Sequence, residues 1–164
     1  MPTNHKHGRE AVILGSARTP HGRFLGAFAS LTAAQLGRVA VKAAVERSGI
    51  QAADVAEVIL GNVVSAGVGQ ALPRQISLGA GLPDSVGGVA INKVCGSGLK
   101  TVMLAANAIK ADDGDLYITG GAESMSNAPY LNKSVRQGNK YGHVQLIDAL
   151  QHDGLWCALC DWSM

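Results

Sequence analysis

The chain has 164 residues, of which 47% are hydrophobic, 16% charged and 4% aromatic, and its formal net charge is +2. This balance excludes a disordered or fibrous chain, gives no electrostatic case for binding nucleic acid or a membrane surface, and leaves room for one domain with a core. No apolar stretch approaches the ~20 residues that cross a bilayer, and residues 1–10 lack an apolar signal core, so we expect a cytoplasmic protein.

The first part of the chain predicts a strand, a helix and a second strand. Residues 11–14 are apolar and predict a first buried strand. Thr32 followed by Gln35 has the capping-box pattern, which predicts a helix that begins after Thr32 and ends at Gly49. Residues 57–62 predict the next strand.

The second part continues the alternation. Pro73 is well placed in the first turn of a short helix that ends near Gly81. Residues 86–92 are apolar and β-branched and predict a buried strand, residues 99–110 have apolar side chains at helical spacing, and residues 116–121 predict a further strand. Strands that alternate with helices through short links predict an α/β fold with a mostly parallel sheet and helices on both faces.

These patterns divide the chain into three parts. Residues 1–9 are expected to form a polar tail, and residues 10–121 an α/β core. In the third part, residues 122–164, the segment up to Tyr141 is rich in polar and turn-forming residues. The segment after it shows no regular spacing of apolar residues that would predict a helix or a strand. We expect this last part to be a surface loop region that needs something to pack against.

Cys95 is the main candidate for catalysis. It follows the predicted strand 86–92 and precedes two glycines, Gly96 and Gly98, that lead into a helix. A thiol in such a turn lies beside unpaired backbone N–H groups and the positive end of the helix dipole, and both favour a thiolate nucleophile. Residue type alone favours an inert core cysteine instead. The spacing leaves both interpretations open.

Several segments, in order and correctly spaced, resemble the N-terminal half of thiolases, which are acyl-CoA:acyl-CoA acyltransferases. Residues 92–100 resemble the signature around the acyl-accepting cysteine of that family. The other matching segments are residues 17–20, 22–24, 61–63, 66–70, 120–129 and 153–155, together with Met164. The resemblance implies a thiolase-like layered fold, of which the chain holds an incomplete N-terminal half with a truncated loop region.

The resemblance also implies a chemistry. Cys95 would carry the acyl group while a 3-ketoacyl-CoA such as acetoacetyl-CoA is made or cleaved, and its backbone N–H would donate to the thioester oxyanion. Leu155 and Met164 would contact coenzyme A. The implied partners are acyl-CoA and CoA, without a metal or other cofactor, in a homo-oligomer (dimer or tetramer) that serves fatty acid and lipid metabolism.

The family's later His, Asn and second-Cys motifs have no counterpart in this sequence. None of the histidines (His5, His7, His21, His143 and His152) lies in a segment that resembles the family's base. We therefore expect the 164-residue chain alone to be inactive or nearly so. We also expect residues 116–121 to form an exposed sheet edge that promotes self-association.

Two alternatives remain. One is a ketosynthase-like condensing enzyme of the same superfamily. The other is a non-catalytic fragment in which Cys157 and Cys160, spaced as Cys-x-x-Cys, form half of a zinc site or a disulfide exchanger. Cys157 stands where the family often has Asp, and Ser163 where many members have His. Three cysteines in a reducing compartment otherwise predict free thiols.

Three charged residues have two interpretations each. Glu123 follows a predicted buried strand, and it either shapes the pocket or caps the backbone of its own turn, which is the commoner role. Arg18 and Arg74 either bind CoA phosphates or make structural or solvated contacts, and the second role is again the commoner one.

Overall fold

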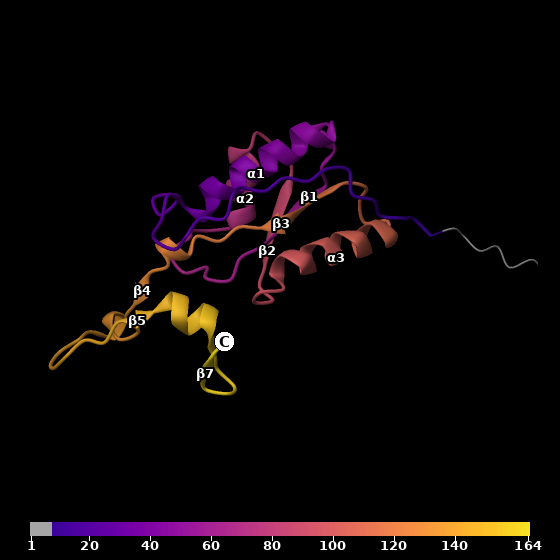
Figure 1. Cartoon of the computed structure of the whole chain (residues 1–164). Coiled ribbons are helices and arrows are strands. Elements are labelled where there is room, and N and C mark those ends of the chain that lie inside the picture. Colours follow the sequence, from indigo (N-terminus) through magenta and orange to yellow (C-terminus); the bar gives the residue numbers. More distant parts are fainter. Residues whose placement is uncertain (1–7) are drawn as a thin grey trace, which may run out of the picture.

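The centre of the molecule is a parallel three-stranded sheet, seen in the computed structural model, which describes residues 8–164 (Figure 1). The strands are β1 (Glu57–Gly61), β2 (Gly87–Ile91) and β3 (Tyr117–Gly121), in the order β2-β1-β3. Both outer strands run parallel to β1, with Glu57 opposite Gly87 on one side and Tyr117 on the other. His5 and His7, like the rest of residues 1–7, lie outside the described residues.

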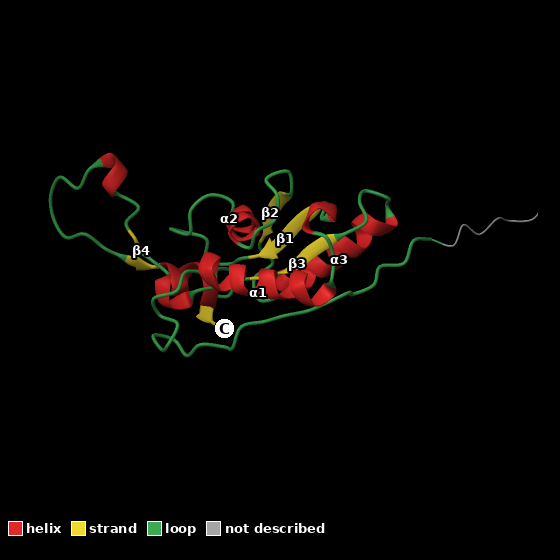
Figure 2. Cartoon of the chain, turned by 90° about the horizontal axis from the view of Figure 1, so that it is seen from above, coloured by secondary structure: helices red, strands yellow, loops and turns green. Residues whose placement is uncertain are grey.

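Helices cover both faces of this sheet, as predicted (Figures 1 and 2). Helices α1 (Ala33–Ser48) and α2 (Leu72–Gly79) pack against each other on one face, and α3 (Ser97–Lys110) packs against β1 and β3 on the other. The prediction of a layered α/β fold with a parallel sheet is confirmed. Among residues 8–164, no helix combines the length and apolarity needed to cross a membrane.

Helix α1 begins and ends where its local sequence predicts. The Thr32 hydroxyl accepts a hydrogen bond from the backbone N–H of Gln35 at 3.2 Å, and the Gln35 side chain accepts one from the backbone N–H of Thr32 at 2.8 Å. Gly49 ends the helix with φ of 69°, a left-handed conformation that glycine adopts without strain. The second helix likewise begins with a proline in its first turn.

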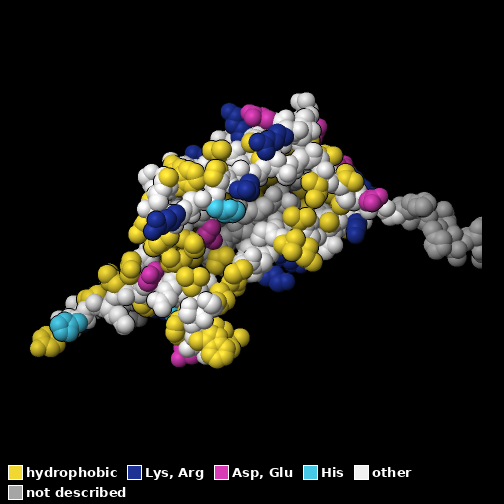
Figure 3. Space-filling view, in the orientation of Figure 1, with side chains coloured by type: hydrophobic (Ala, Val, Ile, Leu, Met, Phe, Trp, Pro, Cys, Tyr) yellow, Lys and Arg dark blue, Asp and Glu magenta, His cyan; other side chains and the backbone are white. Residues whose placement is uncertain are grey.

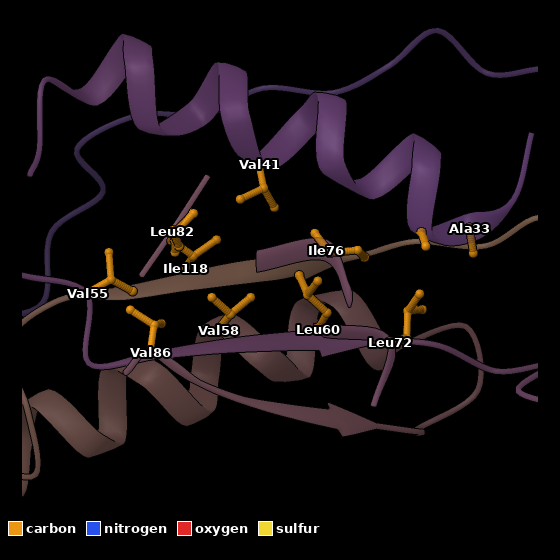
Figure 4. Close-up of a cluster of buried hydrophobic side chains, with 11 residues drawn as sticks. Ala33, Val41, Val55, Val58, Leu60, Leu72, Ile76, Leu82, Val86 and Ile118 are labelled. Carbon is orange, nitrogen blue, oxygen red and sulfur yellow. The ribbon is translucent and has the colours of Figure 1, made fainter. Parts of the chain in front are cut away.

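The core lies between α1 and the sheet (Figure 4). Val58 of β1 and Ile76 of α2 are completely buried there, and Ile118 of β3 joins them. Because side chains alternate along a strand, Ile59 points to the opposite face, where α3 packs. The remaining members of the main cluster are Ala33, Ala34, Val41, Val55, Leu60, Leu72, Leu82 and Val86.

The predicted strand at residues 11–14 is wrong. This segment has no regular structure, and the side chains of Val12, Ile13 and Leu14 are exposed, Ile13 to 81%. It runs opposite β3 and α3 across a groove of about 300 Å³, so no strand lies beside it. A strand needs a partner about 4.8 Å away to pair its N–H and C=O groups. The apolar pattern is present, but no strand in residues 8–164 pairs with this segment.

The strand prediction for residues 86–92 is right, but the expectation that it is buried is wrong. Within residues 8–164, strand β2 pairs only with β1 and forms one edge of the sheet. Val89 at its centre is 39% exposed. Strand β3 forms the other edge of the sheet, as expected for residues 116–121.

Residues 122–164 lead away from the sheet in short elements (Figure 1). Two small antiparallel hairpins occur here, one pairing β4 (Tyr130–Leu131) with β5 (Ile147–Asp148) and one pairing β6 (Trp156–Cys157) with β7 (Trp162–Ser163). A π-helical segment, η4 (Leu150–Leu155), joins the two. The remaining short helices in residues 8–164 are η1 (Ala52–Asp54), η2 (Met125–Asn127) and η3 (Val135–Gln137).

Candidate active site

Cys95 lies in the tight turn between β2 and α3, where the sequence predicts it. Side chains hold this turn. The side-chain oxygen Oδ1 of Asn92 accepts from the Val94 backbone N–H at 2.9 Å. The Ser97 hydroxyl accepts from the Lys93 backbone N–H at 2.8 Å and donates to the Val94 backbone carbonyl at 2.6 Å. Val94 has φ of 47°, which is rare for a β-branched residue and stores on the order of 1–3 kcal/mol of strain. The surrounding hydrogen bonds therefore fix a conformation that the chain would not adopt alone.

The backbone N–H of Cys95 is an available donor in this turn. The N–H of Gly96 donates to the Lys93 carbonyl at 3.0 Å, and that of Ser97 donates to the Val94 carbonyl at 3.1 Å. Within residues 8–164, the N–H of Cys95 itself has no acceptor in hydrogen-bonding geometry. Cys95 is also exposed among the described residues. The interpretation of Cys95 as an inert, buried core cysteine therefore does not hold for this part of the chain. A thiol and an unused amide donor thus occupy the same residue.

Cys95 opens into a pocket of about 410 Å³ at the carboxyl ends of β1 and β3. Gly61 and Gly121 end those strands and line it, and residues 17–21 and α1 close its other side. The polar side chains that line the pocket are Arg18, Thr19, His21, Asn62, Ser97 and Glu123. Figure 3 shows a hollow on this face, with a histidine and an acidic side chain beside it. The pocket is large enough for a small acyl group.

Glu123 ties the ends of two strands together beside Cys95. Its carboxylate accepts from the Asn62 side-chain amide at 2.9 Å and from the Val63 backbone N–H at 2.8 Å. Asn62 also donates to the Ala122 carbonyl at 3.1 Å. Glu123 therefore caps the backbone that follows β1, rather than its own turn as expected, and it lines the pocket as well. Glu123 thus caps backbone, although not that of its own turn, and it also helps to shape the pocket.

The two arginines occupy different places. Arg74 donates to the carbonyls of Val86 and Asp84, each at 2.6 Å, which is the structural role predicted as the commoner one. Arg18 donates to the Thr19 carbonyl at 3.1 Å and lines the pocket. His21, which sequence analysis did not select, lines the same pocket. Its position between the two matched segments 17–20 and 22–24 was the available signal.

Leu155 and Met164 lie together, outside the lining of the pocket that contains Cys95. The Met164 backbone N–H donates to the Leu155 carbonyl at 2.9 Å, which closes the base of the β6–β7 hairpin. Their exposed fractions are 40% and 65%. Neither residue lines the pocket around Cys95. The two residues predicted to contact CoA therefore contact each other, and they do not share the pocket of Cys95.

Cys157 and Cys160 meet in the loop of the same hairpin. The Cys160 backbone N–H donates to the Cys157 sulfur at 3.4 Å. Hydrogen bonds from the Cys160 backbone, the Leu159 backbone and the Cys160 thiol lower the pKa of Cys157. No group of three or more His, Cys, Asp or Glu side chains suited to a metal occurs in residues 8–164, so the described chain offers these thiols no further zinc ligands.

Comparison with known proteins gives one consistent result. The model for the N-terminal domain of thiolase matches residues 11–164. The chain is 47% identical over 156 residues to acetyl-CoA acetyltransferase 2 of Arabidopsis thaliana, covering 95% of this chain and 39% of that protein. It is 49% identical over 156 residues to a probable acetyl-CoA acetyltransferase of Escherichia coli, of which it covers 40%.

A solved structure agrees with these relatives. The crystal structure of the Acat5 thiolase from Ascaris suum in complex with coenzyme A superposes with a TM-score of 0.88 at 41% identity, covering 94% of this chain and 40% of that one. The layered α/β architecture is thus shared over nearly all of the present chain. The chain spans about two fifths of the length of the relatives it matches.

Proposed function

The chain belongs to the thiolase family, and we propose that it carries the acyl-accepting part of a thiolase active site, with Cys95 as the nucleophile. One observation carries this proposal. Cys95 sits exposed in a strained strand-to-helix turn, with its own amide N–H unused among residues 8–164, at the wall of a pocket of about 410 Å³. A structural cysteine needs none of these features.

The proposed step is the transfer of an acyl group from one sulfur to another. The Cys95 thiolate attacks the carbonyl carbon of an acyl-CoA, and the carbonyl π electrons move onto oxygen. When the tetrahedral intermediate collapses, the bond from carbon to the CoA sulfur breaks, CoA leaves as a thiolate, and the acyl group remains on Sγ as a new thioester. A later nucleophile removes the acyl group and restores the thiolate.

The backbone N–H of Cys95 is the proposed donor to the oxyanion. Negative charge collects on the thioester oxygen as the carbon becomes tetrahedral, and a fixed donor stabilises that charge most in the transition state. Since Gly96 and Ser97 already use their N–H groups within the turn, whereas the Cys95 amide has no acceptor in residues 8–164, the Cys95 amide is the donor proposed to bind a substrate. Removing one such donor typically costs on the order of 10²-fold in rate.

The proposed substrates are CoA thioesters. The chain is similar to enzymes named acetyl-CoA acetyltransferases and to a thiolase solved with coenzyme A. We place Leu155 and Met164, at the base of the β6–β7 hairpin, among the CoA contacts of the whole protein. Acyl transfer between two sulfurs changes no oxidation state, so the proposed reaction needs no redox cofactor. It is also proposed to need no metal, because the Cys95 amide donates to the oxyanion.

The whole protein is proposed to make or cleave a 3-ketoacyl-CoA, such as acetoacetyl-CoA, in fatty acid and lipid metabolism in the cytoplasm. It is proposed to do so as a homo-oligomer, for which β2 is a candidate contact because its outer edge is unpaired within the described chain. Acyl loading of Cys95 needs only the groups described above, whereas turnover needs the family's later motifs. The 164-residue chain is therefore expected to accept an acyl group without turning over.

The test is mass spectrometry of the chain after incubation with acetyl-CoA. We expect one acetyl group on Cys95, released by hydroxylamine as a thioester, and none in Cys95→Ser. The matched control is Cys160→Ser, which removes another exposed cysteine and leaves the loading of Cys95 unchanged. Equal acetylation of Cys157, Cys160 and Cys95 would refute the assignment of Cys95 as the nucleophile.

A further inference from the structure

The β6–β7 hairpin contains a second pair of reactive groups, apart from the pocket of Cys95. Its loop spans residues 158–161. The loop joins Cys157, the end of β6, to Trp162, the start of β7, and these two residues pair with each other. The Asp161 backbone N–H donates to the Cys157 carbonyl at 2.9 Å, and Asp161 has φ of 56°, so the chain reverses tightly here. The Asp161 carboxylate also accepts from the Trp156 indole N–H at 3.0 Å, which holds the loop to the strand before it.

This reversal brings the backbone of Cys160 against the sulfur of Cys157, within the Cys-x-x-Cys segment. The Cys157 sulfur accepts a hydrogen bond from the backbone N–H of Cys160 at 3.4 Å. Cys160 is exposed and Cys157 is partly exposed, so both can meet a solute. Two cysteines three residues apart in a preformed turn need little further loss of chain entropy to form a disulfide.

We propose that Cys157 and Cys160 form a reversible dithiol–disulfide pair that exchanges with low-molecular-weight disulfides, with Cys157 as the attacking thiol. This goes beyond the proposed acyl transfer and does not depend on it. Neither cysteine lines the pocket that contains Cys95.

The exchange balances in two steps. The Cys157 thiolate attacks one sulfur of an external disulfide, the external S–S bond breaks, and the first small thiol leaves as a thiolate that takes up a proton. Cys160 then loses its proton to solvent and attacks the Cys157 sulfur, which forms the intramolecular S–S bond and releases the second small thiol. The external disulfide is reduced to two thiols while the protein dithiol is oxidised.

The turn explains why Cys157 attacks first. Hydrogen bonds to its sulfur, above all from the Cys160 backbone N–H, stabilise the thiolate and lower the pKa of Cys157. The thiolate is the attacking species, so at neutral pH a larger fraction of Cys157 is ready to react. Cys160 in turn is placed to resolve the mixed disulfide, because its backbone already contacts the sulfur it must attack.

The experiment uses the 164-residue chain carrying Cys95→Ser, which removes the third thiol. The chain is exposed to oxidised glutathione at pH 7, quenched with acid, alkylated and mapped by peptide mass spectrometry. We expect the peptide with Cys157 and Cys160 to lose two hydrogens and to recover them with dithiothreitol. Adding Cys160→Ser should stop the reaction at a glutathione adduct on Cys157.

Two comparisons make the result decisive. Cys160 in the Cys157→Ser variant should react with oxidised glutathione on the order of tenfold more slowly than Cys157 in the Cys160→Ser variant, the size of effect that thiolate stabilisation in Cys-x-x-Cys turns produces. Ring closure in the parent chain should also be slower in urea, because the turn is then lost. Equal rates for the two single variants, equal closure rates with and without urea, or a pair that stays reduced would each overturn the proposal.

Discussion

Replacing Gly61 with alanine is expected to disturb Cys95 through the backbone. Gly61 ends β1, and a Cβ placed there would lie 2.6 Å from the Cβ of Ser97 and 2.9 Å from the backbone nitrogen of Gly98, both in the first turn of α3. Ordinary contact begins near 3.4 Å, so the start of α3 must move by about 0.8 Å. Cys95 lies just before that turn, so a shift of the turn also displaces Cys95.

The size of the effect follows from two opposing terms. Overpacking a tight contact costs about 1–3 kcal/mol, and backbone atoms cannot rotate out of the way. Alanine in place of a strand glycine returns about 0.5–1 kcal/mol of backbone entropy. The free energy of unfolding should therefore fall by about 1–2 kcal/mol, and acyl loading of Cys95 should slow by on the order of 10-fold or more, because a shift of about 1 Å can cost 10²-fold.

Gly87→Ala is the matched control. Gly87 lies at the start of β2 in the same sheet, and a Cβ there would meet nothing closer than a Glu57 carboxylate oxygen at 3.5 Å. This variant should be as stable as the parent or slightly more stable, with unchanged loading. Urea unfolding and the rate of acetylation by acetyl-CoA measure the two effects. If Gly61→Ala and Gly87→Ala behave alike in both assays, the close packing of β1 on the Cys95 turn is not what positions the nucleophile.

Three further predictions concern the network, the core and the hairpin. Glu123→Gln keeps one acceptor for two donors and should lower the free energy of unfolding in urea by about 1–2 kcal/mol; an unchanged midpoint would contradict the network. Gly37→Ala places a Cβ 2.3 Å from Cδ1 of the buried Ile76, so its overpacking cost of about 1–3 kcal/mol should exceed a helix-propensity gain of about 1 kcal/mol. Adding Ile76→Val removes that methyl group and should make the thermal effect of Gly37→Ala smaller, and strict additivity would refute the contact. Because the Cys160 backbone N–H lowers the pKa of Cys157, iodoacetamide labelling of Cys157 should reach half its maximal rate at a lower pH in the folded chain than in urea. At a pH above the ordinary thiol pKa, the hydrogen-bonded thiolate therefore stabilises the folded state, and this stabilisation is lost as the pH falls through the lowered pKa of Cys157. Labelling curves that coincide in the folded chain and in urea would refute the hydrogen bonds to the Cys157 sulfur.

Local sequence signals predicted the elements that depend on near neighbours. The capping box at Thr32 and the glycine at position 49 fixed both ends of α1 because each contact spans only a few residues. The turn at Cys95 was predicted on the same basis, since strand, glycines and helix follow one another directly. The Glu123 contacts were not predicted, because they join residues about 60 positions apart.

The sequence by itself determined the α/β class, the covered parallel sheet and the residue that stands at the strand-to-helix turn, because spacing and composition encode local conformation. Only the tertiary structure decided that residues 11–14 find no partner strand within residues 8–164, that β2 is an edge strand there, and that His21 and Glu123 line the same pocket as Cys95. The physical reason is that pairing and pocket formation depend on which distant segments become neighbours. An apolar run can satisfy its backbone hydrogen bonds only where a partner strand exists, and its composition does not say whether one does.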